Sequence, residues 1–275
     1  MTPALKAYLG SMCMQANSRV AVVTGGARGI GRAISLQLAS RGYTVVIATR
    51  TLEPALATVE TMGGTSHAVS LDVSDYSAVK TVMAQILADH GHIDVLVNNA
   101  GGSARGDMSL FRYSEEPTWQ RVLASNLMGV MYTTREVINP MLDRGYGRII
   151  NIASVAGTIG TAGQVDYSAS KGAVIAFSSA LAKETAGKGI TVNCVSPGPT
   201  SSEAAREMTP ESIRDTPYER LANATGYGRF AQADEVASMV VYLASEEAGF
   251  ITGQNHPVCG VMNLGLPDQL GGKPD

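Results

Sequence analysis

The sequence predicts an α/β fold in which a doubly wound parallel sheet of about seven strands carries helices on both faces. Short apolar runs such as Val20–Thr24 recur along the chain, and continuous runs of this kind suit strands that are buried on both faces. Segments with helical periodicity separate them, and regular strand–helix alternation is typical of a parallel sheet. With 45% hydrophobic residues, 16% charged residues and 30 glycines, the composition favours close helix–sheet packing over a disordered chain.

The expected elements follow this alternation along the chain. After the first strand, apolar runs predict strands at residues 44–50, 67–71, 94–101, 147–152, 189–195 and near 257–261. Helical patterns cover residues 32–41, 53–62, 74–90, 164–186 and 234–244, and two more helices are expected within 114–144.

The alternation shows no linker and no internal repeat, so we expect one domain at residues 19–262. It follows an N-terminal arm at residues 1–18, which is a poor signal peptide because it has one Lys and no continuous apolar stretch. A substrate lid is expected near 199–231, because long irregular segments inside compact domains are usually functional. Residues 263–275 are expected to form a loose tail.

Composition excludes several classes of function. The net charge of -3 gives no sign of a nucleic-acid-binding surface. The three cysteines, Cys13, Cys194 and Cys259, are far apart and contain no C-x-x-C pair, so neither a disulfide framework nor a zinc site is expected and a reducing, cytoplasmic location is favoured. No apolar run reaches the roughly 18 residues that a membrane span needs.

Glycines follow the first strand in the setting of a dinucleotide-phosphate turn. Gly25, Gly29 and Gly31 lie between the strand and the next helix, in a G-x-x-x-G-x-G spacing. Glycine lets the backbone approach a ligand closely, and a helix N-terminus attracts a pyrophosphate. The segment therefore predicts a Rossmann-type nucleotide site.

The end of the second strand bears on the choice of cofactor. An acidic residue there would bind the ribose 2′-hydroxyl of NAD, but the chain has Thr49 and then Arg50. Arg50 together with Arg28 favours a 2′-phosphate and hence NADP(H). Two observations leave NAD(H) open: Arg50 could simply end a strand in solvent, and Glu53 is close by.

Polar residues also follow the third and fourth strands. Asp72 could accept a hydrogen bond from an adenine amino group, or it could help to start the next helix, with Ser74 as N-cap. The fourth strand ends in two amides and a glycine at the carboxyl edge of the sheet, where open α/β sheets bind ligands.

Tyr167 and Lys171 form the central feature of the sequence. Residues four apart share one face of a helix, and an ammonium one turn from a phenol lowers its pKa and so favours proton transfer. Ser154, just beyond the fifth strand, could hold a substrate carbonyl beside that phenol. Alone, a Tyr–Lys pair at this spacing is more often found on a solvated helix face, and Asn126 alone would be read as a surface amide.

Together these segments resemble the short-chain dehydrogenase/reductase family over roughly residues 18–262, most closely the members that resemble bacterial 3-oxoacyl-carrier-protein reductase. The motifs that match, in the family's order, are T-G-G-A-R-G-I-G at 24–31, L-D-V at 71–73, N-N-A-G at 98–101, Asn126, Ser154, Y-S-A-S-K at 167–171 and P-G at 197–198. The resemblance implies a nicotinamide cofactor and hydride transfer between a ketone and a secondary alcohol, with NADP(H) favoured by Arg28 and Arg50 and NAD(H) possible. It requires no metal.

The resemblance also implies roles for individual residues. Tyr167 would be the proton donor, Ser154 would stabilise the carbonyl oxygen, Lys171 would lower the Tyr167 pKa and bind the nicotinamide ribose, and Asn126 would hold a water that links Lys171 to solvent. Asn98 would be structural. The implied cofactor contacts comprise Gly25, Arg28, Gly29, Ile30, Gly31, Arg50, Asp72, Val73, Asn99, Ala100, Gly101, Tyr167, Lys171, Pro197, Gly198 and Thr200.

Substrate and assembly are less constrained by the sequence. The pocket face expected at residues 102–105 and 155–164 is small and mostly uncharged, which favours a neutral or weakly polar ketone. The resemblance implies a homotetramer paired through helices near 115–144 and 165–186. Two other functions remain open: an NAD-dependent alcohol or polyol dehydrogenase, and a nucleotide-sensing module without turnover, which would be expected to lose Tyr167 or Lys171. The C-terminal strand and Ser202 depart from the family pattern and weaken the case for a carrier-protein substrate.

Overall fold

The computed structural model describes residues 18–103, 108–201 and 217–265. Seven strands form one sheet in the order β3-β2-β1-β4-β5-β6-β9, and every neighbouring pair is parallel. The strands of this sheet are β1 (Val20–Thr24), β2 (Thr44–Thr49), β3 (His67–Ser70), β4 (Val95–Asn98), β5 (Gly147–Ile152), β6 (Ile190–Pro197) and β9 (Asn255–Val258). The predicted doubly wound parallel sheet is confirmed.

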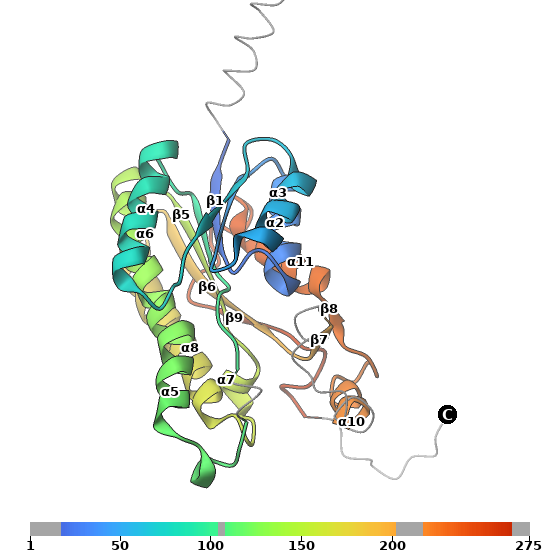
Figure 1. The fold of residues 1–275 in the computed structure, drawn as a ribbon. Coiled ribbons are helices and arrows are strands. Elements are labelled where there is room, and N and C mark those ends of the chain that lie inside the picture. The colour runs from blue at the N-terminus through green and yellow to red at the C-terminus, as the bar shows by residue number, and fades with distance from the viewer. Residues whose placement is uncertain (1–17, 104–107, 202–216, 266–275) are drawn as a thin grey trace, which may run out of the picture.

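Helices cover both faces of this sheet (Figure 1). On one face lie α2 (Gly29–Ser40), α3 (Leu52–Met62) and α11 (Ala233–Ala244), and on the other lie α4 (Tyr76–His90), α6 (Gly129–Arg144) and α8 (Val165–Thr185). Strand side chains alternate between the two layers: Ala21 and Val23 pack in the first, while Val20 and Val22 pack in the second. This alternation explains why the strands read as continuous apolar runs.

The stretch predicted to hold two helices is nearly continuous. The 3-10 turn η2 (Phe111–Tyr113) precedes α5 (Glu116–Leu123), and the π-helical turn η3 (Ala124–Met128) joins α5 to α6. Such π turns are rare and are frequently found at functional sites. Asn126 lies inside this one.

Several predicted boundaries were wrong by a few residues. Helix α4 begins at Tyr76, and its N-cap is Asp75, whose carboxylate accepts from Ala78 N at 3.1 Å, so Ser74 is not the cap. Strand β6 runs on to Pro197, and β9 begins at Asn255, two residues before the expected position.

The segment expected to be a lid is anchored at both ends. The two-residue strands β7 (Thr200–Ser201) and β8 (Ala231–Gln232) pair in parallel, and the helix α10 (Pro217–Asn223) lies between them in sequence. Residues 202–216 of the expected lid lie outside the described residues, as do residues 1–17 of the arm and 266–275 of the tail. The remaining element, α7 (Ala156–Ile159), follows β5.

Candidate active site

The predicted site residues gather at the carboxyl edge of the sheet. Strand order reverses between β1 and β4, because the chain proceeds outward from β1 to β3 on one side and from β4 to β9 on the other. Ligands of open α/β sheets bind outside the strand ends at such a reversal. The glycine turn follows β1, and the amide pair ends β4, so both predicted cofactor segments lie at this point.

The glycine turn is held by hydrogen bonds between Thr24, at the end of β1, and the residues that follow β4. Asn99 Nδ2 donates to the carbonyl oxygens of Thr24 and Gly25, both at 3.0 Å. Thr24 Oγ1 in turn accepts from the backbone N–H groups of Asn99 and Ala100, both at 3.0 Å. These four bonds lock the end of β1 to the end of β4. Asn99 therefore positions the turn, a role that the sequence did not suggest.

Two glycines in this turn cannot be replaced without strain. Gly25 has φ = 65°, in the left-handed region that favours glycine. A Cβ on Gly31 would overlap the carbonyl oxygen of Gly25 and the amide of Asn99. Because Gly31 has no side chain, α2 packs directly against the turn, and the backbone of residues 25–31 forms what we call the glycine cradle.

The N-terminus of α2 faces this cradle with its backbone donors uncapped. Its N-cap residue, Arg28, makes no side-chain cap bond, and the first turn contains no acidic residue. Free N–H groups and the helix dipole favour an anionic group here. With the glycine cradle, these donors fit the pyrophosphate of a dinucleotide, while Gly29 and Ile30 lie in the same turn.

Arg50 and Asp72 lie close enough to interact. Arg50 is exposed just past β2, and its charge contributes to holding the pKa of the Asp72 carboxyl below its usual range, after hydrogen bonds from Ser74, which are the main cause. Asp72 Oδ1 accepts from Ser74 Oγ at 2.7 Å and from Ser74 N at 3.0 Å. One carboxylate oxygen thus shapes the turn before α4.

Asn126 is completely buried, so the surface reading is wrong. Its side chain pairs twice with one backbone unit: Oδ1 accepts from Gly102 N and Nδ2 donates to Gly102 O, each at 2.9 Å. A Cβ on Gly101 (φ = 136°) would overlap Asn126 Oδ1. Through these two bonds Asn126 holds the loop after β4 in place. The water relay through Asn126 stays a prediction, because the amide oxygen and nitrogen can each make one more hydrogen bond.

Lys171 is buried one helical turn from Tyr167, beside the end of β5. Its ammonium lies 5.9 Å from the centre of the Tyr167 ring and donates to the carbonyl oxygen of Ile152 at 2.7 Å. Burial lowers the pKa of Lys171 to about 8. Tyr167 is half-buried, and Ser154 is half-buried just past β5, where its hydroxyl accepts from Ala156 N at 3.2 Å.

A chain of buried polar side chains runs beneath Lys171 across three strands. Asn98 donates to Asn151 at 2.8 Å, Asn151 donates to the Ser178 hydroxyl at 2.8 Å, and the Cys194 thiol lies 3.0 Å from that hydroxyl. Asn98 is structural, as expected, and Cys194 is a core residue whose thiol pKa is raised by burial to about 11. Sequence patterns gave no sign of Asn151 or Ser178, because each stands in an otherwise apolar or helical run.

The end of β6 packs closely against the C-terminal segment. Gly198 N donates to Val258 O at 3.0 Å, and a Cβ on Gly198 would press on Cys259. Thr200 Oγ1 donates to Gly198 O at 3.0 Å. Pro197, Gly198 and Thr200 therefore form one ordered turn beside β5, and the unusual C-terminal segment forms its outer support.

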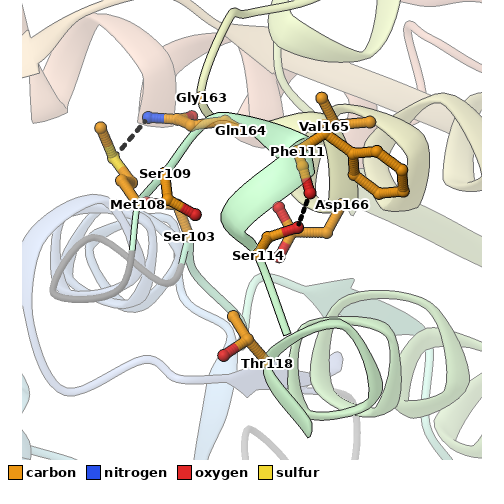
Figure 2. Close-up of a pocket in the computed structure, with 10 residues that line it drawn as sticks. All are labelled: Ser103, Met108, Ser109, Phe111, Ser114, Thr118, Gly163, Gln164, Val165 and Asp166. Atoms are coloured by element: carbon orange, nitrogen blue, oxygen red, sulfur yellow. Dashed lines mark hydrogen bonds between the residues drawn. The ribbon is translucent and has the colours of Figure 1, made fainter. Parts of the chain in front are cut away.

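A pocket opens between the loop after β4 and the start of α8, where Figure 2 shows its lining side chains. The lining residues are Ser103, Met108, Ser109, Phe111, Ser114, Thr118, Gly163, Gln164, Val165 and Asp166. The expected pocket face included Ser103, Gly163 and Gln164, but it did not include Val165, Asp166 or the five lining residues from Met108 to Thr118. These residues come from a loop, a 3-10 turn and the first turns of two helices, where no sequence periodicity marks a pocket.

Two classes of site find no support in this part of the molecule. Within residues 18–103, 108–201 and 217–265, no three His, Cys, Asp or Glu side chains gather in a way that could hold a metal ion. The helices of the same ranges include none that combines the length and the apolar character of a membrane span.

Comparison with known proteins identifies the family. Residues 19–212 match the short chain dehydrogenase family. Acetoacetyl-CoA reductase of Shinella zoogloeoides is 43% identical over 236 residues, which cover 86% of this chain and 95% of that protein. A 3-oxoacyl-acyl-carrier-protein reductase of Escherichia coli is 37% identical over 251 residues, covering 91% and 100%.

A solved structure agrees in fold as well as in sequence. The crystal structure of a variant of actinorhodin polyketide ketoreductase with NADPH superposes with a TM-score of 0.84 at 34% identity, and the match covers 90% of this chain and 98% of that one. Sequence, sheet topology and the arrangement of the carboxyl edge thus lead to one conclusion: the chain belongs to the short-chain dehydrogenase family.

Proposed function

We propose that the chain is an NADPH-dependent carbonyl reductase that converts a ketone to a secondary alcohol. The observation that carries the proposal is the buried Lys171 ammonium, one helical turn from Tyr167 and beside the end of β5. The relatives agree, since they are named as reductases of acetoacetyl-CoA and 3-oxoacyl substrates, and the matching structure contains NADPH.

The chain's own residues would hold the cofactor along the carboxyl edge. The glycine turn with Arg28, Gly29 and Ile30 would take the pyrophosphate, and Arg50 would take a 2′-phosphate. Asp72 and Val73 would lie at the adenine, Asn99 to Gly101 at the ribose, and the turn of Pro197, Gly198 and Thr200 at the nicotinamide. When bound, NADPH supplies the hydride.

Three side chains would manage the proton and the developing charge. Tyr167 donates its phenolic proton to the carbonyl oxygen, and the Ser154 hydroxyl donates a hydrogen bond to the same oxygen. The Lys171 ammonium stabilises the tyrosinate that is left behind. Asn126 holds the loop after β4 in place, so that this side of the substrate site keeps a fixed conformation.

Replacement of Tyr167 by Phe tests the proposal. NADPH oxidation with ketones and 3-oxoacyl thioesters should fall by about 100- to 10,000-fold, the usual contribution of a general acid, while NADPH still binds. Tyr242→Phe is the matched control, since Tyr242 lies half-exposed on α11, and it should keep full activity.

This experiment also separates the alternatives. A nucleotide-sensing module would show no turnover in the wild type and no effect of Tyr167→Phe on partner binding. An NAD-dependent alcohol or polyol dehydrogenase would lose activity in the variant but would prefer NAD(H) and oxidation. Oxidation of NADPH well ahead of NADH by the wild type contradicts both.

We also propose a cytoplasmic homotetramer built from domains at residues 19–262. Cys194 and Cys259 are free and buried, in keeping with a reducing compartment. Leu123 on α5 and Met131 on α6 are partly exposed apolar side chains on the helices expected to pair. Sedimentation that shows a monomer at micromolar concentration would contradict the assembly without affecting the reaction.

A further inference from the structure

We infer that the pocket at the start of α8 binds the non-reacting arm of the carbonyl substrate, and that Asp166 makes it select arms with neutral hydrogen-bond donors over arms that end in an anion. This inference rests on the proposed reductase function and deepens it by naming a class of substrate. It concerns the ten lining residues of Figure 2.

The pocket adjoins the proposed proton donor. Gly163 to Asp166 form one wall and lead directly into Tyr167. Asp166 Oδ1 accepts from the backbone N–H of Tyr167 at 2.8 Å. In this inference, a substrate whose carbonyl meets the Tyr167 hydroxyl extends its remaining atoms toward these residues. The pocket is thus a natural place for an arm that extends from the ketone.

The lining is rich in hydroxyl groups and has an apolar rim. Ser103, Ser109, Ser114 and Thr118 contribute hydroxyls, and Gln164 contributes an amide. Met108, Phe111 and Val165 are each about half exposed, at 48%, 56% and 47%. Phe111 is braced by stacking on Trp119, with ring centres 5.2 Å apart. Such a surface suits a short chain with polar groups rather than a purely apolar tail.

Asp166 is the single charged residue among the ten that line the pocket. The neighbouring guanidinium of Arg112 lies over the ring of Tyr113, 4.5 Å from its centre, and neither residue lines the pocket. Among these ten described residues, a carboxylate or phosphate on the substrate would therefore meet a negative charge and no cationic side chain, whereas a hydroxyl or an amide N–H would meet an acceptor.

Two polar groups of this wall retain bonding capacity. Among the described residues, Asp166 Oδ2 has no hydrogen-bond partner, since the bond from Tyr167 uses Oδ1. Gln164 Nε2 donates only to the Met108 sulfur at 3.1 Å, and a thioether is a weak acceptor. A hydrogen-bond donor on the substrate would give Asp166 Oδ2 a partner, and an acceptor on the substrate would give Gln164 Nε2 a stronger partner than the Met108 sulfur.

Methyl ketones of equal chain length that end in a methyl, hydroxyl or carboxylate group test the inference. The wild type should show a kcat/KM for the hydroxyl-ended ketone about tenfold above that for the carboxylate-ended one, as expected for one partly screened charge. Asp166→Asn keeps an oxygen for the Tyr167 N–H and should reduce this ratio by about five- to tenfold, mainly through KM for the carboxylate-ended ketone.

A control and a second variant make the result specific. Asp143→Asn removes the same charge from an exposed position in the last turn of α6 and should leave the ratio unchanged. Gln164→Lys places an ammonium on the same wall and should raise kcat/KM for the carboxylate-ended ketone, even if Asp166→Asn fails to fold.

The outcomes distinguish the inference from the proposed function. Turnover of the methyl-ended ketone by the wild type reports carbonyl reduction itself, and its absence for every ketone and thioester would count against the reductase proposal. Turnover with no preference against the carboxylate, or a preference that neither Asp166→Asn nor Gln164→Lys changes, overturns the subsite and leaves the reaction standing.

Discussion

The cofactor half and the substrate half of the carboxyl edge are built in different ways. In the cofactor half, the turn after β1 is held by hydrogen bonds that Asn99 donates to Thr24 and Gly25, and there is no room for a side chain at Gly31. In the substrate half, Met108, Phe111 and Val165 are about half exposed and face an open pocket. Backbone geometry restricts the sequence of the first half, whereas side-chain choice determines the character of the second.

Lys171 lies at the junction of these halves, and the largest predicted effect concerns its burial. Its pKa falls from 10.5 to about 8 because the charged form loses solvation. This shift corresponds to a free energy of unfolding that is about 3 kcal/mol lower at neutral pH. Lys171→Met should therefore raise the free energy of unfolding at pH 7 by up to about 3 kcal/mol, less the lost bond to Ile152 O, while turnover is lost. Such a gain in stability, together with the loss of turnover, would indicate that the buried ammonium serves the reaction at a cost in stability.

The pH dependence gives the sign of this effect. Below pH 8, Lys171 is protonated in both states and the penalty is fully present. Between pH 8 and 10.5 the unfolded chain binds more protons than the folded chain, so wild-type stability should rise with pH. Denaturant unfolding at pH 7, 9 and 10.5 should show this rise in the wild type and not in Lys171→Met. Parallel curves for the two proteins would show that the buried ammonium has no such cost.

A pair of glycines compares the two halves directly. Gly31→Ala places a Cβ against the carbonyl of Gly25, and overpacking of this kind typically lowers stability by about 1–3 kcal/mol. Because the turn must move to make room, NADPH affinity should also fall, by roughly 10- to 100-fold. Gly102→Ala meets no atom within 4 Å and should leave NADPH affinity within about twofold. Calorimetric titration of both variants measures the difference. Equal losses of NADPH affinity in the two variants would mean that close packing at Gly31 has no specific part in NADPH binding.

The same contrast explains what could be predicted from sequence. The parallel sheet, the glycine turn and the Tyr167–Lys171 pair were all legible, because buried strands and close backbone approaches allow few residue types. The two hydrogen bonds between Asn126 and Gly102 and the polar chain from Asn98 to Cys194 could not be predicted, because a polar residue in a buried segment leaves no periodic pattern in the sequence. They depend on segments that meet only after folding.

The pocket was located only in part for a related reason. Gln164 could be placed near the site because it lies three residues before Tyr167. Met108 and Phe111 come from a loop whose path depends on tertiary contacts, including the stacking of Phe111 on Trp119. Nothing in the sequence pattern assigned Asp166 to a substrate site, since a carboxylate in the first turn of a helix is explained by the helix dipole.

Phe111 offers a smaller test, within the substrate half. Phe111→Ala removes an exposed ring that is braced on Trp119, so the protein should lose little stability. KM for hydroxyl-ended and methyl-ended ketones should rise by about three- to tenfold, as for a lost apolar contact, with NADPH affinity unchanged. Steady-state kinetics at saturating NADPH measures this. An equal rise in the Kd for NADPH would show that the two halves are not independent.

The smallest predicted effect tests whether Arg50 selects the cofactor. Its guanidinium is exposed, so the 2′-phosphate contact is partly screened, and the nearby Asp72 carboxylate offsets some of its charge. Arg50→Gln should therefore lower kcat/KM for NADPH by only about three- to tenfold, with NADH almost unaffected. Arg41→Gln is the control, because Arg41 is equally exposed but follows α2 at the amino edge of the sheet. If Arg50→Gln leaves the preference for NADPH unchanged, the 2′-phosphate contact is to be assigned to Arg28 instead. A preference of the wild type for NADH would exclude a 2′-phosphate site altogether.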